Sequence, residues 1–454
     1  MLKNKQSYAL LSLFMLIFIL IAFKGLKTIQ PGDENVYYYM GKLVSEGKIP
    51  YRDFFFAHPP LHIYLTALVY KLFGFNIVAL KLMPLISTLI TSFFIFRIAK
   101  KFGNFEAVAA SLLFLSSYSV MFNSIFSFGI ELAAMFLVIG AYFLLNKNNY
   151  WTAGLFFGLA GITRLLSLIP IAIISILVLF STKKSFFKLS SGFLMIFLLA
   201  NGIFFFLSGS YLSYAYDYHL KKTFGGKESF KEYLDILKLN WLLFFSAFLL
   251  IFAKGKKQMG LFALVSLAYL LFLTVLKKIF GFYFIIIFPF LAIIGACSIV
   301  NLVNAFSKKL RIAALLILAL LFAWNLSSDI MFLEQIGFRG FERGNDLADF
   351  VALNSNEETM LFGDESVAPL LALETNKRIA LDFVDTNNQV FTSGMKDIGN
   401  LLAALKGLDT LFIIRSNQGI SSFREVREFL NKDCELLSQF HDKMEGNYLI
   451  YRCD

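Results

Sequence analysis

Residues 31–74 read PGDENVYYYMGKLVSEGKIPYRDFFFAHPPLHIYLTALVYKLFG and follow the first apolar stretch of the chain. The segment opens on two neighbouring acids, Asp33 and Glu34, and acids are rare in this part of the sequence. Only ten of the 31 Asp and Glu residues precede Ser328, and eight of those ten lie in two loops between apolar stretches. Carboxylates confined to such loops indicate a polar site at the surface of a membrane.

The composition is that of a polytopic α-helical membrane protein. The 454 residues are 58% hydrophobic, include 55 Phe and have a mean hydropathy of +0.68. A soluble domain cannot bury that much apolar surface. The net charge of +11 comes from small basic clusters between apolar runs, a pattern typical of cytoplasmic loops. We therefore expect a membrane-lipid environment and no nucleic-acid partner.

About eleven transmembrane helices are expected. The first follows Lys3 and Lys5 and is not followed by a small-residue cleavage site, so we expect a retained signal anchor. Some of the segments are shorter than the roughly 20 residues that a perpendicular helix needs. The segments are Tyr8–Phe23, Ile77–Ala99, Phe105–Phe122, Gly129–Leu145, Tyr150–Gly161, Leu165–Phe180, Phe186–Leu207, Trp241–Ala253, Leu261–Leu276, Phe282–Phe306 and Ile312–Leu326.

The charge pattern also predicts the topology. Residues 57–74 could form a span or a helix lying along the membrane surface. With a cytoplasmic N-terminus and a surface helix here, five basic loop clusters fall inside, whereas a span here would move them all outside. We therefore expect an outer first loop at 24–76 and an extracytoplasmic C-terminal domain, in a multi-pass protein of the plasma membrane and cell envelope. The five clusters are Lys100-Lys101, Lys147, Lys183-Lys184, Lys254-Lys256-Lys257 and Lys308-Lys309-Arg311.

Residues 329–454 have the composition of a soluble domain, so we divide the chain into a membrane domain at 1–328 and an α/β domain at 329–454. Cys434 and Cys453 either pair, if this domain is extracytoplasmic, or remain free thiols. Gly363-Asp364-Glu365 follows an apolar run, and we interpret it as a plain turn and not as a ligand loop. The expected strands are Thr359–Phe362, Ile379–Phe383, Leu411–Arg415, Glu435–Gln439 and Tyr448–Tyr451, and the expected helices lie near Asn345–Leu353, Lys396–Leu405 and Ser422–Leu430.

Several cations lie on the predicted outer side, where the positive-inside rule does not explain them. Lys277 and Lys278 fall on the predicted outer side between two spans, and His219 and Lys222 lie in the outer loop at 208–240. Cations that face a polar pocket at a membrane surface indicate an anionic ligand, and phosphate is the obvious candidate.

The loop at 31–74 resembles the first outer loop of the GT-C membrane glycosyltransferases, in particular the family of protein O-mannosyltransferases and lipid A aminoarabinose transferases. In that family an acidic pair opens the loop, a helix follows, and a His/Lys-Pro-Pro-Leu element precedes an aromatic helix that ends in Phe-Gly. Here Asp33-Glu34, His58-Pro59-Pro60-Leu61 and Leu72-Phe73-Gly74 occupy those places. The resemblance is strong over residues 24–102, weaker to about residue 325, and absent from the C-terminal domain.

The resemblance implies an inverting transfer of a sugar from a polyprenyl-phosphate (dolichyl-phosphate type) donor to a protein, glycan or lipid acceptor outside the cytoplasm. Asp33 matches the family's catalytic base, although a helix N-cap is an alternative role for it, and Glu34 would assist. The positions expected to bind the donor phosphate are His58, Arg164, His219, Lys222, Lys277, Lys278 and Tyr283. Glu131 would be a second acidic site, although a buried ion pair between Glu131 and Arg164 is an equal alternative. A divalent cation, Mg²⁺ or Mn²⁺, could be held by Asp33, Glu34 and Glu131.

The main alternative is a transporter or flippase for lipid-linked sugars, in which the carboxylates and cations serve ion coupling or headgroup binding. Transporters usually carry internal repeats with helices broken at matching places. This sequence has one break, around Thr163-Arg164 within residues 150–180, and no repeat. The enzyme is therefore the favoured hypothesis.

Overall fold

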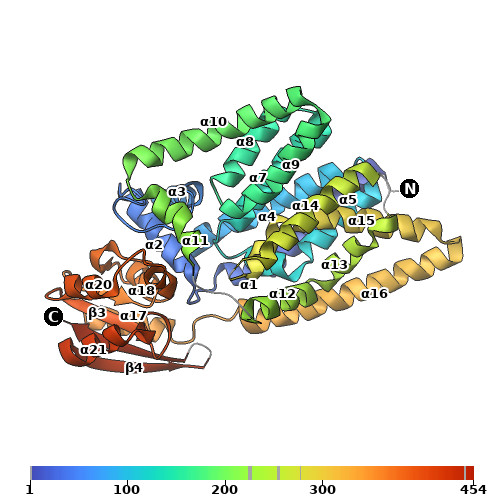
Figure 1. The fold of residues 1–454 in the computed structure, drawn as a ribbon. Coiled ribbons are helices and arrows are strands. Elements are labelled where there is room, and N and C mark those ends of the chain that lie inside the picture. The colour runs from blue at the N-terminus through green and yellow to red at the C-terminus, as the bar shows by residue number, and fades with distance from the viewer. Residues whose placement is uncertain (1–2, 223–226, 253–255, 277, 444–445, 454) are drawn as a thin grey trace. The chain divides into compact units, whose positions relative to one another are not determined.

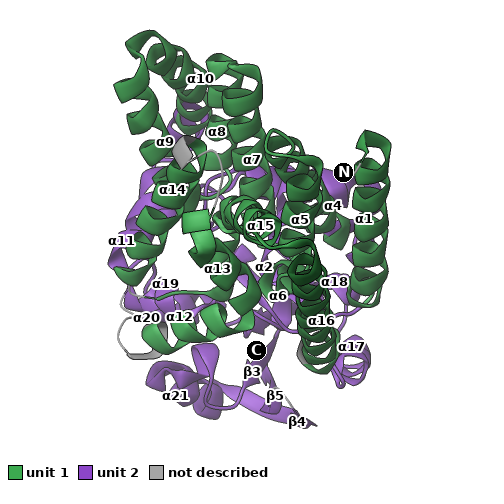
Figure 2. Ribbon diagram, turned by 90° about the vertical axis from the view of Figure 1, so that its right-hand side faces the viewer, with its two compact units in different colours: residues 1–27, 81–201, 224–338 green, residues 28–80, 202–223, 339–454 purple. Residues whose placement is uncertain are grey.

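The computed structural model describes residues 3–222, 227–252, 256–276, 278–443 and 446–453. The chain divides into two compact units, shown in different colours in Figure 2. Unit 1 contains residues 1–27, 81–201 and 224–338, and unit 2 contains residues 28–80, 202–223 and 339–454. Unit 2 therefore joins the predicted first outer loop to the C-terminal domain. The division of the sequence after residue 328 stays a prediction, and a single helix, α16 (Lys308–Phe332), continues across it.

Unit 1 is helical and holds most of the apolar segments that the sequence predicts (Figure 1). Its centre is α7 and α15, whose apolar windows are 72% buried. Two helices run across the boundaries between the units, α4 (Ile77–Ala99) and α10 (Lys183–Leu207). The other helices are α1 (Asn4–Leu26), α5 (Asn104–Leu115), α6 (Tyr118–Asn123), α7 (Ile130–Lys147), α8 (Tyr150–Gly161), η1 (Leu165–Ser167), α9 (Leu168–Ser181), α12 (Lys227–Leu239), α13 (Trp241–Phe248), η3 (Leu249–Phe252), α14 (Lys256–Thr274), η4 (Gly281–Ile286), α15 (Phe288–Ala305) and η5 (Leu333–Gly337).

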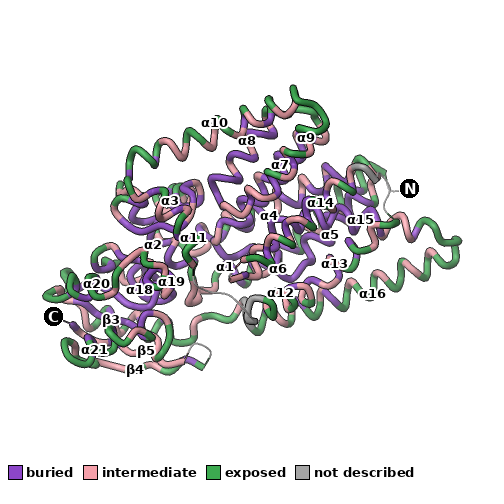
Figure 3. The backbone as a smooth tube through the Cα atoms, viewed as in Figure 1, coloured by how far each residue is buried: buried purple, intermediate pink, exposed green. Residues whose placement is uncertain are grey.

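Several of these helices are exposed or only half-buried along most of their length (Figure 3), and many of their exposed residues are large and apolar. The apolar window of α16 is only 6% buried and that of α10 is 17% buried. Contiguous apolar surface of this extent needs lipid around it. Six helices of the described residues are long and apolar enough to cross a membrane, or seven if the bent pair Phe230–Leu239 and Trp241–Phe252 is one span. The protein is thus a multi-pass membrane protein, and the expected number of about eleven spans is not confirmed.

Two segments with ambiguous sequences form short helices. Residues 150–181 form α8 and α9 with a break at η1, as two half-helices would. Helix α3 (Leu61–Phe73) has 13 residues, which at 1.5 Å per residue gives about 20 Å, less than the roughly 30 Å of a bilayer core. Its length agrees with the predicted surface helix, whose placement on a membrane stays a prediction.

Unit 2 contains a five-stranded sheet of order β2-β1-β3-β5-β4. Strands β1 (Met360–Gly363), β2 (Arg378–Ile379) and β3 (Thr410–Arg415) are parallel, whereas β4 (Cys434–Asp442) and β5 (Gly446–Cys453) form an antiparallel hairpin against β3. Four of the five expected strands and the three expected helices of the α/β domain are therefore confirmed. The expected strand Ile379–Phe383 is wrong beyond Ile379, because the chain turns into the 3-10 helix η6 (Ala380–Asp382) there. The remaining helices of unit 2 are α2 (Asp33–Ser45), η2 (Ser213–Asp217), α11 (Tyr218–Lys221), α17 (Gly344–Leu353), α18 (Ala368–Glu374), η6 (Ala380–Asp382), α19 (Asn388–Thr392), α20 (Ile398–Leu405), η7 (Gly419–Ser422) and α21 (Arg424–Asp433).

Alternate residues of each strand face the two sides of this sheet, as the pleat requires. Leu361 and Leu411 pack into a core with α2, α17 and α18. Phe362 and Phe412 pack into a second core with α20 and α21. The segment between α1 and α3 therefore supplies one of the helices that cover the sheet, and α2 also contacts α18 directly.

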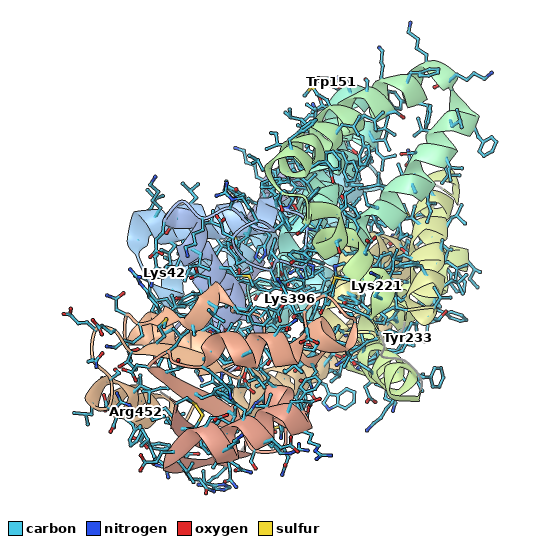
Figure 4. The ribbon with its side chains drawn as sticks, turned by 60° about the vertical axis from the view of Figure 1, so that its left-hand side comes forward. Lys42, Trp151, Lys221, Tyr233, Lys396 and Arg452 are labelled. Atoms are coloured by element: carbon cyan, nitrogen blue, oxygen red, sulfur yellow. A yellow bond between two sulfur atoms is a disulfide. The ribbon has the colours of Figure 1, made fainter. Side chains whose placement is uncertain are left out.

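The outer hairpin of the sheet is closed by a disulfide between Cys434 and Cys453. The two residues are register partners at the end of β4 and β5, near Arg452, which Figure 4 labels. The pairing that the sequence left open is thus formed, and Cys297 is free and buried in α15.

We predict that Gly363→Ala disrupts the sheet. Gly363 has φ +136°, and a Cβ there would lie 1.8 Å from the Ile413 carbonyl oxygen, so β1 and β3 would have to separate. The expected cost is about 3 kcal/mol or more, seen as faster limited proteolysis after residue 339. Gly407→Ala is the matched control, because its φ of +80° is also positive but nothing lies within 4 Å. Equal proteolysis rates for the two variants would contradict this prediction.

Candidate functional site

The acidic pair lies in the first turn of α2, which begins at Asp33. The N-cap residue is Gly32, so the alternative role of Asp33 as an N-cap is wrong. The positive end of the helix dipole stabilises both carboxylates. Asp33 is exposed, whereas Glu34 is 1% exposed and accepts a hydrogen bond of 3.1 Å from the hydroxyl of Tyr38. The two acids therefore differ in their surroundings: Asp33 is exposed, and Glu34 is buried inside unit 2.

Two histidines are connected to α2 through Tyr37. Tyr37 follows Asp33 by one helical turn, which places both side chains on one face, and its hydroxyl is hydrogen-bonded to His58 Nε2 at 3.0 Å. The His58 ring stacks on the His219 ring at 5.2 Å, and His219 Nε2 donates to the Ala57 carbonyl at 2.6 Å. Tyr51 donates to the His58 carbonyl at 2.6 Å. The structure thus brings Asp33, His58 and His219, which the sequence singled out separately, into one region.

A turn of the C-terminal domain is bonded to the loop that carries Asp33. The Ser366 carbonyl accepts hydrogen bonds from Gly32 N at 3.2 Å and from Asn35 Nδ2 at 2.8 Å. Asn35 Nδ2 also donates to the Gln30 carbonyl at 2.8 Å, which closes the loop on itself. The segment Gly363-Asp364-Glu365, interpreted from the sequence as a plain turn, therefore lies beside the acidic pair.

Three carboxyl groups interact electrostatically around this turn: Asp33, Glu365 and Asp385. Burial raises the pKa of Glu365 well above its ordinary value, and the neighbouring carboxylates Asp364, Asp385 and Asp33 add to the rise. Burial likewise raises the pKa of Asp385 to about 6, Asp33 adding to the rise and Lys222 opposing it. Among the cations expected to bind the donor phosphate, Lys222 is therefore one that acts electrostatically on these acids. Its Nζ also lies 4.8 Å from the centre of the Tyr218 ring.

The sequence reasoning missed Glu365 and Asp385, together with the ion pair between Arg415 and Asp364 (2.8 Å). Asp364 and Glu365 directly follow β1, and Arg415 is the last residue of β3. Asp385 follows β2 after the short helix η6. Carboxyl ends of parallel strands meet at one edge and commonly form binding sites. The alternation of strands and helices along residues 359–451 carries this signal in the sequence.

The other predicted residues lie in unit 1. Glu131, at the start of α7, is 3% exposed and Arg164 is 5% exposed, and the guanidinium interacts electrostatically with the carboxylate. Tyr283 lies in η4, which packs against both α7 and η1. Lys278 Nζ lies 4.8 Å from the centre of the Phe280 ring, and Lys277 lies outside the described residues. These elements therefore form a second cluster, in unit 1.

The predicted metal set does not come together within one unit, because Asp33 and Glu34 belong to unit 2 and Glu131 to unit 1. Within the part of the chain that the structure describes, no group of three His, Cys, Asp or Glu residues could hold a metal ion. The described residues do not fit a resident cation, and no chemical step is derived through one.

Comparisons with known proteins bear on the fold. Residues 57–207 match the family described as dolichyl-phosphate-mannose-protein mannosyltransferase. ArnT from Cupriavidus metallidurans in the apo state superposes with a TM-score of 0.70 at 13% sequence identity, covering 97% of both chains. The chain has the GT-C fold.

The crystal structure of the same ArnT bound to undecaprenyl phosphate gives a TM-score of 0.68, again at 13% identity over 97% of both chains. No curated protein sequence matches this chain. The GT-C likeness extends through the C-terminal domain, since 97% of the chain is covered. This corrects the expectation that the resemblance ends before residue 329.

Proposed function

We propose that this protein transfers a sugar from a polyprenyl-phosphate donor to an acceptor hydroxyl or amine at the extracytoplasmic face of the membrane, with Asp33 as the general base. The observation that carries the proposal is the exposed carboxylate of Asp33 on the same face of α2 as the Tyr37–His58–His219 group. The GT-C fold and the likeness to an ArnT crystallised with undecaprenyl phosphate support the choice of donor. The acceptor class is protein, glycan or lipid.

In the proposed reaction Asp33 takes the proton from the acceptor O–H or N–H as that atom attacks the anomeric carbon. The bond between the anomeric carbon and the phosphate oxygen breaks, and its electron pair leaves with the lipid phosphate. A single displacement from the opposite face inverts the anomeric configuration. Negative charge on the departing phosphate needs fixed donors nearby, and His58, His219 and Lys222 are the side chains of unit 2 proposed to supply them.

The proposed role of the second cluster follows from its charges. Arg164, Lys278 and Tyr283 are proposed to contact the donor phosphate or its lipid, and Glu131 is the proposed second acidic site. An intramembrane carboxylate beside a buried guanidinium is costly to maintain and commonly marks a functional site. The ion-pair alternative assigns both residues a structural role, and neutral substitutions that leave transfer intact would favour it.

Two observations support an extracytoplasmic site. The disulfide between Cys434 and Cys453 is of a kind that persists in oxidising compartments. The basic clusters of the membrane part obey the positive-inside rule when the N-terminus is cytoplasmic. We therefore propose a multi-pass protein of the plasma membrane with unit 2 outside the cytoplasm.

Asp33→Asn is expected to lower transfer from a polyprenyl-phosphate sugar by about 100-fold or more, because the amide cannot accept the acceptor proton. The measurement is a transfer assay with purified protein and a panel of such donors, alongside undecaprenyl-phosphate binding, which should be retained. Asp349→Asn is the control, since Asp349 is another exposed helical acid of unit 2. Donor translocation in liposomes without any transfer would instead identify a flippase.

His58→Ala is expected to raise the KM for the donor by about tenfold or more, through loss of a hydrogen bond to the phosphate. His441→Ala is the matched control, because His441 is an exposed histidine of β4 that is hydrogen-bonded to Asn447 at 2.8 Å. Equal donor KM values for wild type and both variants would remove His58 from the proposed phosphate site.

A further inference from the structure

An unbroken series of contacts runs from the sheet of the C-terminal domain to the loop of Asp33. Arg415 Nε, at the end of β3, donates to Asp364 Oδ2 at 2.8 Å. Asp364 Oδ1 accepts from Ser366 N at 2.9 Å, and also from the Ser366 hydroxyl. The Ser366 carbonyl then holds Gly32 N and Asn35 Nδ2. Every residue of this series belongs to unit 2.

The series starts at the point of the sheet where the direction of the connections reverses. From β1 the chain crosses to β2 on one side, and from β2 it returns past β1 to β3 on the other. Segments that leave the carboxyl ends of such neighbouring strands diverge and leave room for side chains between them. Asp364 follows β1 and Arg415 ends β3, so their ion pair lies at this reversal. The Asp364 side chain is 1% exposed, so Arg415 is needed to compensate a buried charge.

Asn35 connects this edge to the acid. It is 1% exposed, and its amide nitrogen donates to both the Ser366 and Gln30 carbonyls. These two hydrogen bonds fix the residues on either side of Asp33 in the sequence. A carboxylate at a helix N-terminus would otherwise move with the loop that precedes it, and small displacements of a general base are costly to catalysis.

Two further hydrogen bonds order the same edge. Thr386 Oγ1 donates to the Gly363 carbonyl at 2.5 Å, and Asn387 Nδ2 donates to Glu365 Oε1 at 3.4 Å. They tie the segment after η6 to the turn that follows β1.

We propose that Asn35, Asp364 and Arg415 are positioning residues for Asp33, and that the carboxyl edge of the C-terminal sheet thereby completes the site of transfer. The C-terminal domain is then a working part of the transferase. This inference rests on the proposed function for its catalytic part, whereas its positioning part concerns the loop alone.

The test uses the full-length protein in detergent, with Asn35→Ala and Arg415→Met. Amide hydrogen exchange at residues 30–40 is expected to speed up in both variants, a result that does not depend on any activity. In the transfer assay kcat is expected to fall about tenfold or more, with the donor KM within about twofold of wild type. Arg415→Lys keeps the charge and is expected to recover part of kcat.

Two matched controls remove similar contacts elsewhere in unit 2. Asn354→Ala removes a hydrogen bond to the Phe350 carbonyl (2.8 Å), and Arg452→Met removes the ion pair with Asp409 (3.0 Å). Neither should change kcat or exchange at residues 30–40. Because Arg415→Met leaves a buried carboxylate without its cation and can unfold the domain, Asn35→Ala, which leaves the ion pair intact, decides the positioning claim.

Unchanged exchange in Asn35→Ala overturns the positioning claim. A wild type that transfers nothing overturns the proposed function and leaves the exchange result standing.

Discussion

The Ser366 carbonyl accepts hydrogen bonds from Gly32 N and Asn35 Nδ2, and through them a turn of the C-terminal sheet holds the start of α2. The rest of unit 2 is built around this connection. Helix α2 covers one face of the sheet and packs on α18. The hydroxyl of Tyr37, on α2, is hydrogen-bonded to His58. The His58 ring in turn stacks on the ring of His219, from a distant part of the chain. The connection holds the first turn of α2, where Asp33 lies, against the turn that follows β1.

Different parts of this chain are suited to different surroundings, lipid for the apolar helices and water for the polar groups of unit 2. Helices α10 and α16 leave apolar side chains exposed because lipid will surround them. Few carboxylates of the described residues lie on the apolar helices, and one of them, Glu131, is buried and interacts electrostatically with Arg164. Unit 2 is where titratable groups can gather, and there Asp33, Glu365, Asp385 and Lys222 influence one another. A transfer reaction on a lipid-borne donor needs both environments, since the donor's tail belongs in lipid and its reacting carbon among polar groups.

Much of the fold could be predicted from the sequence, because hydropathy and strand–helix alternation are local signals. Four of the five strands of the C-terminal domain, the break between α8 and α9 and the pairing option of Cys434 with Cys453 could be predicted in this way, whereas the expected strand Ile379–Phe383 gives way to η6 after Ile379. The number of spans was not, since segments such as α5 and α9 are apolar but too short to show by composition whether they cross a bilayer. At the site, Asp33 and His58 were found through a motif. Glu365, Asp385 and Arg415 were missed, because their importance depends on which strand ends become neighbours, and that is set by sheet order and not by spacing along the chain.

The most direct measurement of the central claim is a double-mutant cycle on kcat between Asn35→Ala and Arg415→Met. If both residues act through the Ser366 carbonyl on the position of Asp33, the double variant should lose little more activity than the more damaging single variant. If the two losses simply multiply, Asn35 and Arg415 act independently, and the claim that the C-terminal sheet positions the acid is contradicted.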